Sequence, residues 1–207
     1  MASARHLVVV AGAEPAATDA LASALRDDGT VRTAYSADAL RESLDAEVDV
    51  VLVDAELVDG SLDSLLTDVR TREFDCQIGV TTADPDDSVA LETHVDTVVG
   101  REPEAVREAV QWLATRARYR GRLDEFYDLA ERRASLADGE RDQAALDRLD
   151  RQLDRLRRDL DDLSEDLGED SVFDAALSPD ERALASRTAR EDTAAEGPGG
   201  PTDSDDE

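Results

Sequence analysis

An acidic side chain, Asp54, directly follows the most apolar segment of the chain, residues 48–53. If that segment is a buried strand, the carboxylate lies beyond its carboxyl end, where open α/β sheets carry their chemistry. A carboxylate in this place can act as a nucleophile toward a phosphoryl donor. Such a reaction needs a divalent cation with oxygen ligands, and a cation and a hydroxyl to hold the phosphoryl oxygens. Other polar residues that follow apolar runs are Glu14, Thr82 and Arg101.

The elements that would position these residues follow from the apolar pattern. Strand-length apolar runs occupy residues 7–11, 31–35, 48–53, 78–81 and 95–99. Helix-like segments with an apolar face occupy residues 16–27, 37–44, 61–72 and 103–117, with a weaker candidate at 86–92. Short, nearly continuous β-branched runs are typical of strands buried on both faces of a parallel sheet. The alternation therefore predicts a doubly wound α/β domain with five parallel strands and right-handed crossovers.

The second half of the chain has a helical pattern. Residues 119–137 form a segment whose apolar side we expect to contain Tyr119, Leu123, Phe126, Tyr127, Ala130 and Ala134. After a break at Gly139 comes a leucine heptad pattern, formed by Leu146, Leu149, Leu153, Leu156, Leu160, Leu163 and Leu167. Another helix has to cover such a narrow stripe, and Gly168 is placed to end the segment. We expect a further short helix from residue 178, and a disordered acidic tail over residues 186–207.

The composition is strongly acidic. The chain carries 51 acidic residues against 23 basic ones, a formal charge of −28, and every basic residue is arginine. We interpret this as adaptation to a salt-rich cytoplasm, in which repulsion is screened within about 3 Å at 1 M salt. The charge disfavours nucleic acid and anionic membranes as partners. Cys76 is the single cysteine, and no apolar run is long enough to span a bilayer, so we expect a cytoplasmic protein.

The strand-end residues resemble those of response-regulator receiver domains. Residues 10–15 stand at the acidic motif after the first strand, residues 53–54 at the phospho-acceptor motif, and residues 82–83 at the Thr-Ala motif. The resemblance implies a flavodoxin-like fold over residues 5–116, with Asp54 as the phospho-acceptor candidate and Thr82 as the switch candidate. Gly12 and Ala13 stand where the family has its metal-binding carboxylates.

These departures bear on phosphorylation. The family lysine is missing, and Arg101 stands one residue beyond its place. A magnesium site would rest on Asp54 with Glu14 or Glu56, which leaves too few oxygen ligands for firm binding. We therefore expect a pseudo-receiver that is not phosphorylated by the usual metal-dependent route, with no cofactor beyond weakly bound Mg²⁺.

The helical region resembles the HalX domain, a haloarchaeal helical module attached to receiver domains. The resemblance is carried by residues 118–136, which read RYRGRLDEFYDLAERRASL, and by Val172-Phe173-Asp174. It implies a HalX-like domain over residues 117–185, forming an α-helical hairpin or coiled coil. The leucine stripe is then the expected oligomer or partner interface, although the pattern leaves open whether it packs within the chain or against a second chain.

The resulting hypothesis is a signalling protein of a two-component phosphorelay that acts through protein partners, such as a histidine kinase or another regulator, and through possible homodimers. The alternatives are a working receiver phosphorylated at Asp54, and a structural coiled-coil adaptor. An enzyme is not expected, because the sequence has no glycine-rich phosphate loop and no metal-ligand cluster. The two histidines, His6 and His94, lie far apart in the sequence.

Overall fold

The computed structural model describes residues 6–57, 61–71, 74, 76–85, 95–138, 143–168 and 172. Five strands form one parallel sheet in the order β2-β1-β3-β4-β5. They are β1 (Leu7–Ala11), β2 (Thr30–Ala34), β3 (Val50–Asp54), β4 (Gln77–Thr82) and β5 (Thr97–Gly100). This strand order is that of the flavodoxin-like doubly wound fold, which confirms the predicted fold class.

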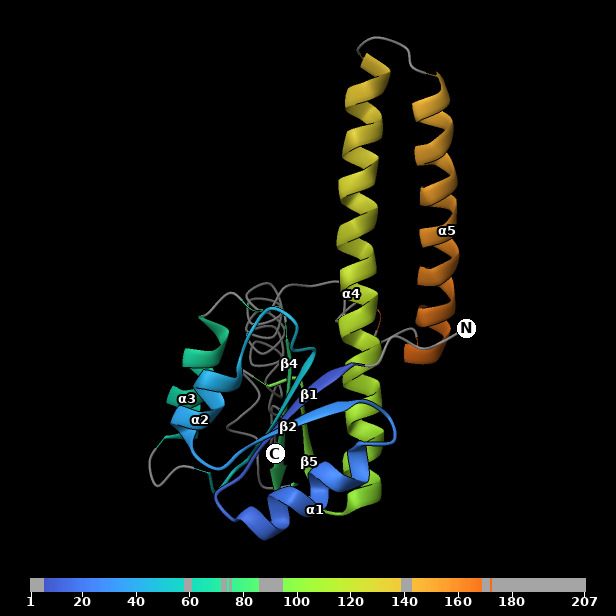
Figure 1. Cartoon of the computed structure of the whole chain (residues 1–207). Helices are drawn as coiled ribbons and strands as arrows, with labels where there is room; N and C mark the ends of the chain where they lie inside the picture. Colours follow the sequence, from blue (N-terminus) through green and yellow to red (C-terminus); the bar gives the residue numbers. More distant parts are fainter. Residues whose placement is uncertain are drawn as a thin grey trace, which may run out of the picture. The chain divides into compact units, whose positions relative to one another are not determined.

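Helices cover both faces of the sheet (Figure 1). Helices α2 (Ala37–Ser43) and α3 (Leu62–Arg70) pack on one face, while α1 (Pro15–Leu25) and the first half of α4 (Pro103–Asp138) pack on the other. Alternate residues of β1 enter the two cores: Val9 packs toward α2 and α3, and Val8 and Val10 pack toward α1 and α4. Burial on both sides explains why these strands read as continuous apolar runs.

The helix starts follow from local chemistry. Ser36 and Ser61 cap α2 and α3 by accepting hydrogen bonds from the backbone N–H groups of Ala39 and Ser64. Helix α1 begins at Pro15, whose missing N–H has no intrahelical partner to lose. The weak helix expected at residues 86–92 lies outside the described residues, as do the short helix from residue 178 and the acidic tail.

Helix α4 differs from the sequence-based expectation. The two segments predicted at 103–117 and 119–137 are one continuous helix of 36 residues. Near their junction Gly121 weakens the helix at a cost of about 1 kcal/mol, and no proline interrupts it. The helix therefore crosses the predicted domain boundary at residues 116–117 without a break, and the sheet and the helical region belong to one unit, Met1–Ala176.

The second half of α4 pairs with α5 (Gln143–Leu167), and the two helices lie side by side (Figure 1). The pair is antiparallel, because Arg133 contacts Asp150 while Arg122 lies 4.0 Å from Asp159. The leucine heptad thus packs within its own chain as one arm of a hairpin. Helix α5 ends before Gly168, whose φ of 79° and hydrogen bond to the carbonyl of Ser164 close it as predicted.

Candidate functional site

The strand ends gather the predicted residues around one cavity. Asp54 ends β3 and pairs in register with Thr81 of β4, while Arg101 directly follows β5. A cavity of about 330 Å³ lies at this edge. Its lining includes Gly12, Glu14, Thr18, Asp54, Glu56, Thr81 and Arg101. The structure therefore brings Asp54, Glu14 and Arg101 together, as the motif positions indicated.

Protein groups surround the carboxylate of Asp54. Its Oδ1 accepts hydrogen bonds from the backbone N–H of Glu56 at 2.8 Å and from Nη2 of Arg101 at 2.9 Å. Its Oδ2 accepts from Nε of Arg101 at 2.9 Å and from the Thr81 hydroxyl at 3.3 Å. A carboxylate has about four acceptor sites. The chain itself therefore uses the full accepting capacity of Asp54.

Arg101 is the centre of this arrangement. Besides its two-point pair with Asp54, its Nη2 lies 3.0 Å from Oε1 of Glu56. The hydrogen bonds that Arg101 donates to Asp54, and then to Glu56, raise the pKa of Arg101 above its ordinary value. A planar guanidinium suits such a bidentate contact, whereas a lysine ammonium would act as a point charge. Arg101 thus binds the acceptor carboxylate itself.

The first strand end is closed by a buried threonine. Gly12 follows β1, and a Cβ placed there would lie 2.5 Å from Oγ1 of Thr18. Thr18 is buried in α1, and its hydroxyl donates to the backbone carbonyl of Glu14 at 2.8 Å. A side chain at position 12 would therefore require Thr18 to shift. Sequence reasoning missed Thr18, because nothing in a helical Ala-Ala-Thr segment indicates such a contact.

The two threonines at the end of β4 have different partners. The hydroxyl of Thr81 donates to Asp54, whereas the oxygen of Thr82 accepts a long hydrogen bond, 3.4 Å, from the backbone N–H of Asp84. The motif indicated Thr82 as the switch candidate, and the register instead places Thr81 opposite Asp54. Two adjacent threonines cannot be separated by their sequence, because only the strand register decides which one faces the carboxylate.

The donor set does not fit a magnesium ion. Asp54 has its acceptor sites used, Gly12 and Ala13 supply no side-chain oxygen, and Glu14 is exposed. Among the described residues, no group of three or more histidine, cysteine, aspartate or glutamate side chains is placed to hold a metal. Magnesium prefers octahedral coordination and keeps water ligands, so it binds poorly where protein donors already satisfy the available carboxylate.

The leucine stripe forms the hairpin core. Leu153, Leu156 and Leu167 are buried, whereas Leu146, Leu149, Leu160 and Leu163 are half-buried. The partner core on α4 is built from Phe126, Leu129 and Ala130. Leu129 was absent from the predicted apolar side, and Tyr127, which was placed on it, is 63% exposed. Because adjacent helical residues point about 100° apart, only one of Phe126 and Tyr127 can face α5.

A buried ion pair at the opposite edge of the sheet was also missed. Arg70 of α3 donates to the fully buried carboxylate of Asp96 at 2.7 Å and to the backbone carbonyl of Cys76 at 2.8 Å. The same carboxylate oxygen accepts from the backbone N–H of Ile78 at 2.7 Å. This pair joins α3 to the starts of β4 and β5. Two charged residues 26 positions apart give no sequence signal that they meet.

Comparisons with known proteins match part of the chain. No family model matches the chain. A Haloferax volcanii protein described as "Putative transcriptional regulator" is 30% identical over 108 residues, which is 51% of this chain and 19% of that protein. The chain thus spans about a fifth of the length of this curated relative.

Solved structures similar to the chain include an uncharacterized protein from Neptuniibacter caesariensis, at TM-score 0.50 and 18% identity over 56% of this chain and 92% of that one. A response regulator receiver domain protein from Clostridium thermocellum gives a TM-score of 0.48 and 19% identity, and the match covers 55% of this chain and 97% of that one. The signal receiver domain of NarL from Mycobacterium tuberculosis gives a TM-score of 0.47 and 21% identity, and the match covers 53% of this chain and 96% of that one. At this level of identity the likeness concerns the fold alone, and the strand order places the N-terminal half in the flavodoxin-like class.

No helix in the part of the chain that the structure describes is both long and apolar enough to cross a membrane.

Proposed function

We propose that this protein is a response-regulator-like signalling protein whose receiver-like domain is a pseudo-receiver, and whose HalX-like helical hairpin binds protein partners or a second copy. The observation that carries the first part is the environment of Asp54: the chain's own donors occupy its acceptor sites, and Arg101 takes two of them. In this proposal the protein binds and positions partners, and catalyses no reaction.

Phosphorylation would require Asp54 to attack a phosphoryl group while a metal offsets the negative charge. Arg101 would have to leave at least one carboxylate oxygen before that oxygen could attack. No carboxylate at positions 12 or 13 would then hold the metal, and Thr18 restricts the space beside position 12. Both obstacles favour a domain that keeps one state without phosphoryl transfer.

The Asp54–Arg101 pair also supports a route from the site to the hairpin. Arg101 lies two residues before Pro103, where α4 begins. The pair therefore connects the end of β3 to the N-terminus of that helix. Helix α4 then continues without a break into the hairpin. This continuous path supports coupling between a partner at the strand ends and a partner at the hairpin.

The alternative is a working receiver that a histidine kinase phosphorylates at Asp54. It is favoured by one observation: Asp54 keeps 19% of its side chain exposed and lines an open cavity. In the adaptor alternative, the α/β domain serves only as the base of the hairpin.

Chemical phosphorylation separates these functions. The full chain is incubated with acetyl phosphate and Mg²⁺, and separately with beryllofluoride and Mg²⁺, and its intact mass and spectra are recorded. We expect no change that depends on Asp54, so that the chain and its Asp54→Ala variant behave alike. A receiver domain that retains its acidic pair, treated in parallel, shows that the reagents are active. An adduct on the chain that disappears in Asp54→Ala would refute the pseudo-receiver proposal and establish the alternative.

A further inference from the structure

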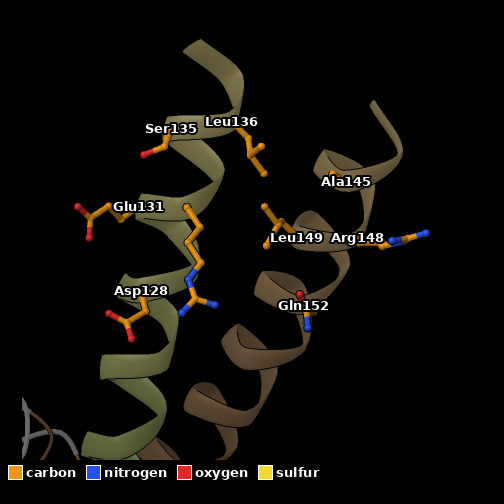
Figure 2. Close-up of a pocket in the computed structure, with 9 residues that line it drawn as sticks. Asp128, Glu131, Ser135, Leu136, Ala145, Arg148, Leu149 and Gln152 are labelled. Atoms are coloured by element: carbon orange, nitrogen blue, oxygen red, sulfur yellow. The ribbon is translucent and has the colours of Figure 1, made fainter. Parts of the chain in front are cut away.

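The distal part of the hairpin has an open apolar groove. Leu136 of α4 and Ala145 and Leu149 of α5 lie between the two helices, and Figure 2 shows Leu136 and Leu149 pointing into the space between the ribbons. The groove has a volume of about 750 Å³. Leu136 is 37% exposed, and Leu149 is only half-buried. Two helices alone leave this end of the leucine stripe partly in contact with water.

The charges around the groove are balanced. Its lining contains two carboxylates, Asp128 and Glu131, and two guanidiniums, Arg132 and Arg148. Within the described part of the chain these four side chains form no ion pair or side-chain hydrogen bond. The lining is thus neutral in a chain of charge −28, and its charged groups are available to a partner.

The whole hairpin shares this balance. Residues 117–168 contain 11 of the 23 arginines but only 15 of the 51 acidic residues. Two copies of a chain with charge −28 repel each other over most of their surfaces. They repel least where the local net charge is small and apolar side chains are exposed. The hairpin groove meets both conditions, which favours a second copy as its occupant.

The charge pattern also selects an orientation. On α4 the groove carries Asp128, Glu131 and Arg132, a net charge of −1, and on α5 it carries Arg148, a charge of +1. If a two-fold axis runs parallel to the helices, α4 of one copy faces α5 of the other, and acidic groups meet a basic one. If the axis runs across the hairpin, α4 faces α4 and the carboxylates oppose each other. A two-fold interface pairs each surface patch with its own copy, and the net charges of the two helices are complementary only in the first arrangement.

The same complementarity is present within each hairpin. All five arginines of α5 lie in residues 148–158, and five of its eight acidic residues lie in 159–166. On α4, Arg118, Arg120 and Arg122 precede the acidic positions of 124–131. Antiparallel pairing places opposite charges side by side, as in the Arg122–Asp159 contact. An α4–α5 contact between copies repeats this antiparallel match.

We propose that a second copy of this chain docks in the groove formed by Leu136, Ala145 and Leu149, so that two hairpins form a four-helix bundle whose two-fold axis is parallel to the helices. Leu136 of each copy covers Leu149 of the other, and Arg148 of each copy faces the Asp128 and Glu131 carboxylates of the other. This inference specifies the partner in the hairpin part of the proposed function, and it does not depend on the state of Asp54.

Charge exchange tests the interface. The full-length chain and two variants, Glu131→Arg and Arg148→Glu, are studied by sedimentation equilibrium at several salt concentrations. We expect the wild-type chain to be a dimer, and each variant to have a dissociation constant at least about tenfold higher. In an equimolar mixture of the two variants, both interchain pairs regain opposite charges, so we expect heterodimers to form. The difference between the dissociation constants of the wild-type chain and of each single variant should shrink as salt rises, because salt screens exposed charges.

Two further variants separate the interface from folding. Leu136→Glu places a charge in the groove and should give a monomer with wild-type helicity. Tyr127→Glu changes a more exposed aromatic residue of the same helix that does not line the groove, and it should leave the dimer intact. A wild-type monomer, a dimer insensitive to Leu136→Glu, or variants that fail to associate on mixing would each overturn the proposal. None of these results depends on phosphorylation, so the Asp54 proposal is judged separately.

Discussion

Arg101 holds Asp54 through two parallel hydrogen bonds, Nε to Oδ2 and Nη2 to Oδ1, each of 2.9 Å. The pair joins the end of β3 to the residue just after β5, 47 positions away in the sequence. Bidentate pairs of this kind are stronger than single contacts, because geometry and charge act together. The arrangement makes the candidate phospho-acceptor a structural element of the sheet edge.

We predict that Arg101→Ala destabilises the fold by about 1–2 kcal/mol, a value reduced from that of a buried charged pair because Arg101 is 35% exposed. Urea unfolding at constant salt measures the change. Glu56→Gln is the control: Glu56 is 74% exposed and should contribute less than about 0.5 kcal/mol. If Arg101→Ala unfolds at the wild-type urea concentration, the pair does not stabilise the sheet edge.

A second prediction concerns the contact between Gly12 and Thr18. Gly12→Ala should cost about 1–3 kcal/mol, because the new Cβ would lie 2.5 Å from the Thr18 hydroxyl. Thr18→Ala removes that oxygen. The double variant should therefore lose less unfolding free energy than the two single variants lose in total. A double-mutant cycle from urea unfolding gives this coupling energy. Additive effects would mean that Thr18 does not restrict position 12.

Most of the fold could be predicted from the sequence. The five apolar runs became five parallel strands with ends shifted by at most two residues, and the signal is strongest in β1, β3 and β4, which are buried on both faces. The continuity of α4 could not be predicted with the same ease. The two resemblances placed a boundary between residues 116 and 117, yet the backbone has no breaker there, and a helix continues until something stops it.

The site was predicted in part. Asp54, Glu14 and Arg101 were found because strand ends are visible in the sequence and parallel strands end at the same edge. Thr18 and Thr81 were missed because their roles depend on packing and register. The antiparallel hairpin was one of two possibilities left open by the leucine heptad. The opposed charge gradients of 118–131 and 148–166 favour an antiparallel pairing of these two segments, and they were the available signal for the direction of the helices.

A third prediction concerns the buried pair of Arg70 and Asp96. Asp96→Ala should destabilise the fold by about 3–5 kcal/mol, because it leaves a guanidinium with 11% exposure and the N–H of Ile78 without their carboxylate. Thermal or urea unfolding tests this value. The matched control is Asp68→Ala, which breaks the more exposed pair with Arg41 and should cost no more than about 1 kcal/mol. Equal effects of both changes would contradict a special role for the buried pair.

The hairpin core provides a fourth prediction. Leu153→Ala should lower stability by about 2–4 kcal/mol and reduce helicity, because Leu153 is buried against Phe126 and Leu129. Far-UV circular dichroism during urea unfolding reports both quantities. Leu146→Ala, at a half-buried position of the same stripe, should have a clearly smaller effect. If the two substitutions cost the same, the stripe is not packed as the hairpin requires.

A fifth prediction follows from His6, which precedes β1 and is half-buried. Burial lowers its pKa from the ordinary 6.5, and the charge of Arg118 acts in the same direction, while Asp49 and Asp28 partly oppose both. Its Nε2 has no hydrogen-bond partner among the described residues, so protonation there gains no acceptor. The folded state thus binds this proton more weakly than the unfolded state does.

The sign of the pH effect follows from this difference. Between the lowered folded pKa and 6.5 the unfolded chain binds more protons, so stability rises with pH across that interval. The stabilisation is complete above 6.5 and is lost as pH falls through the folded pKa of His6. We therefore expect the free energy of unfolding to fall on acidification below 6.5, and to fall less in His6→Gln. Urea unfolding on both sides of that pH measures the two slopes, and Arg107→Gln, which breaks the nearby pair with Asp28 but removes no histidine, is the control. If the pH dependence in His6→Gln equals that of the wild-type chain, the titration of His6 does not couple to folding.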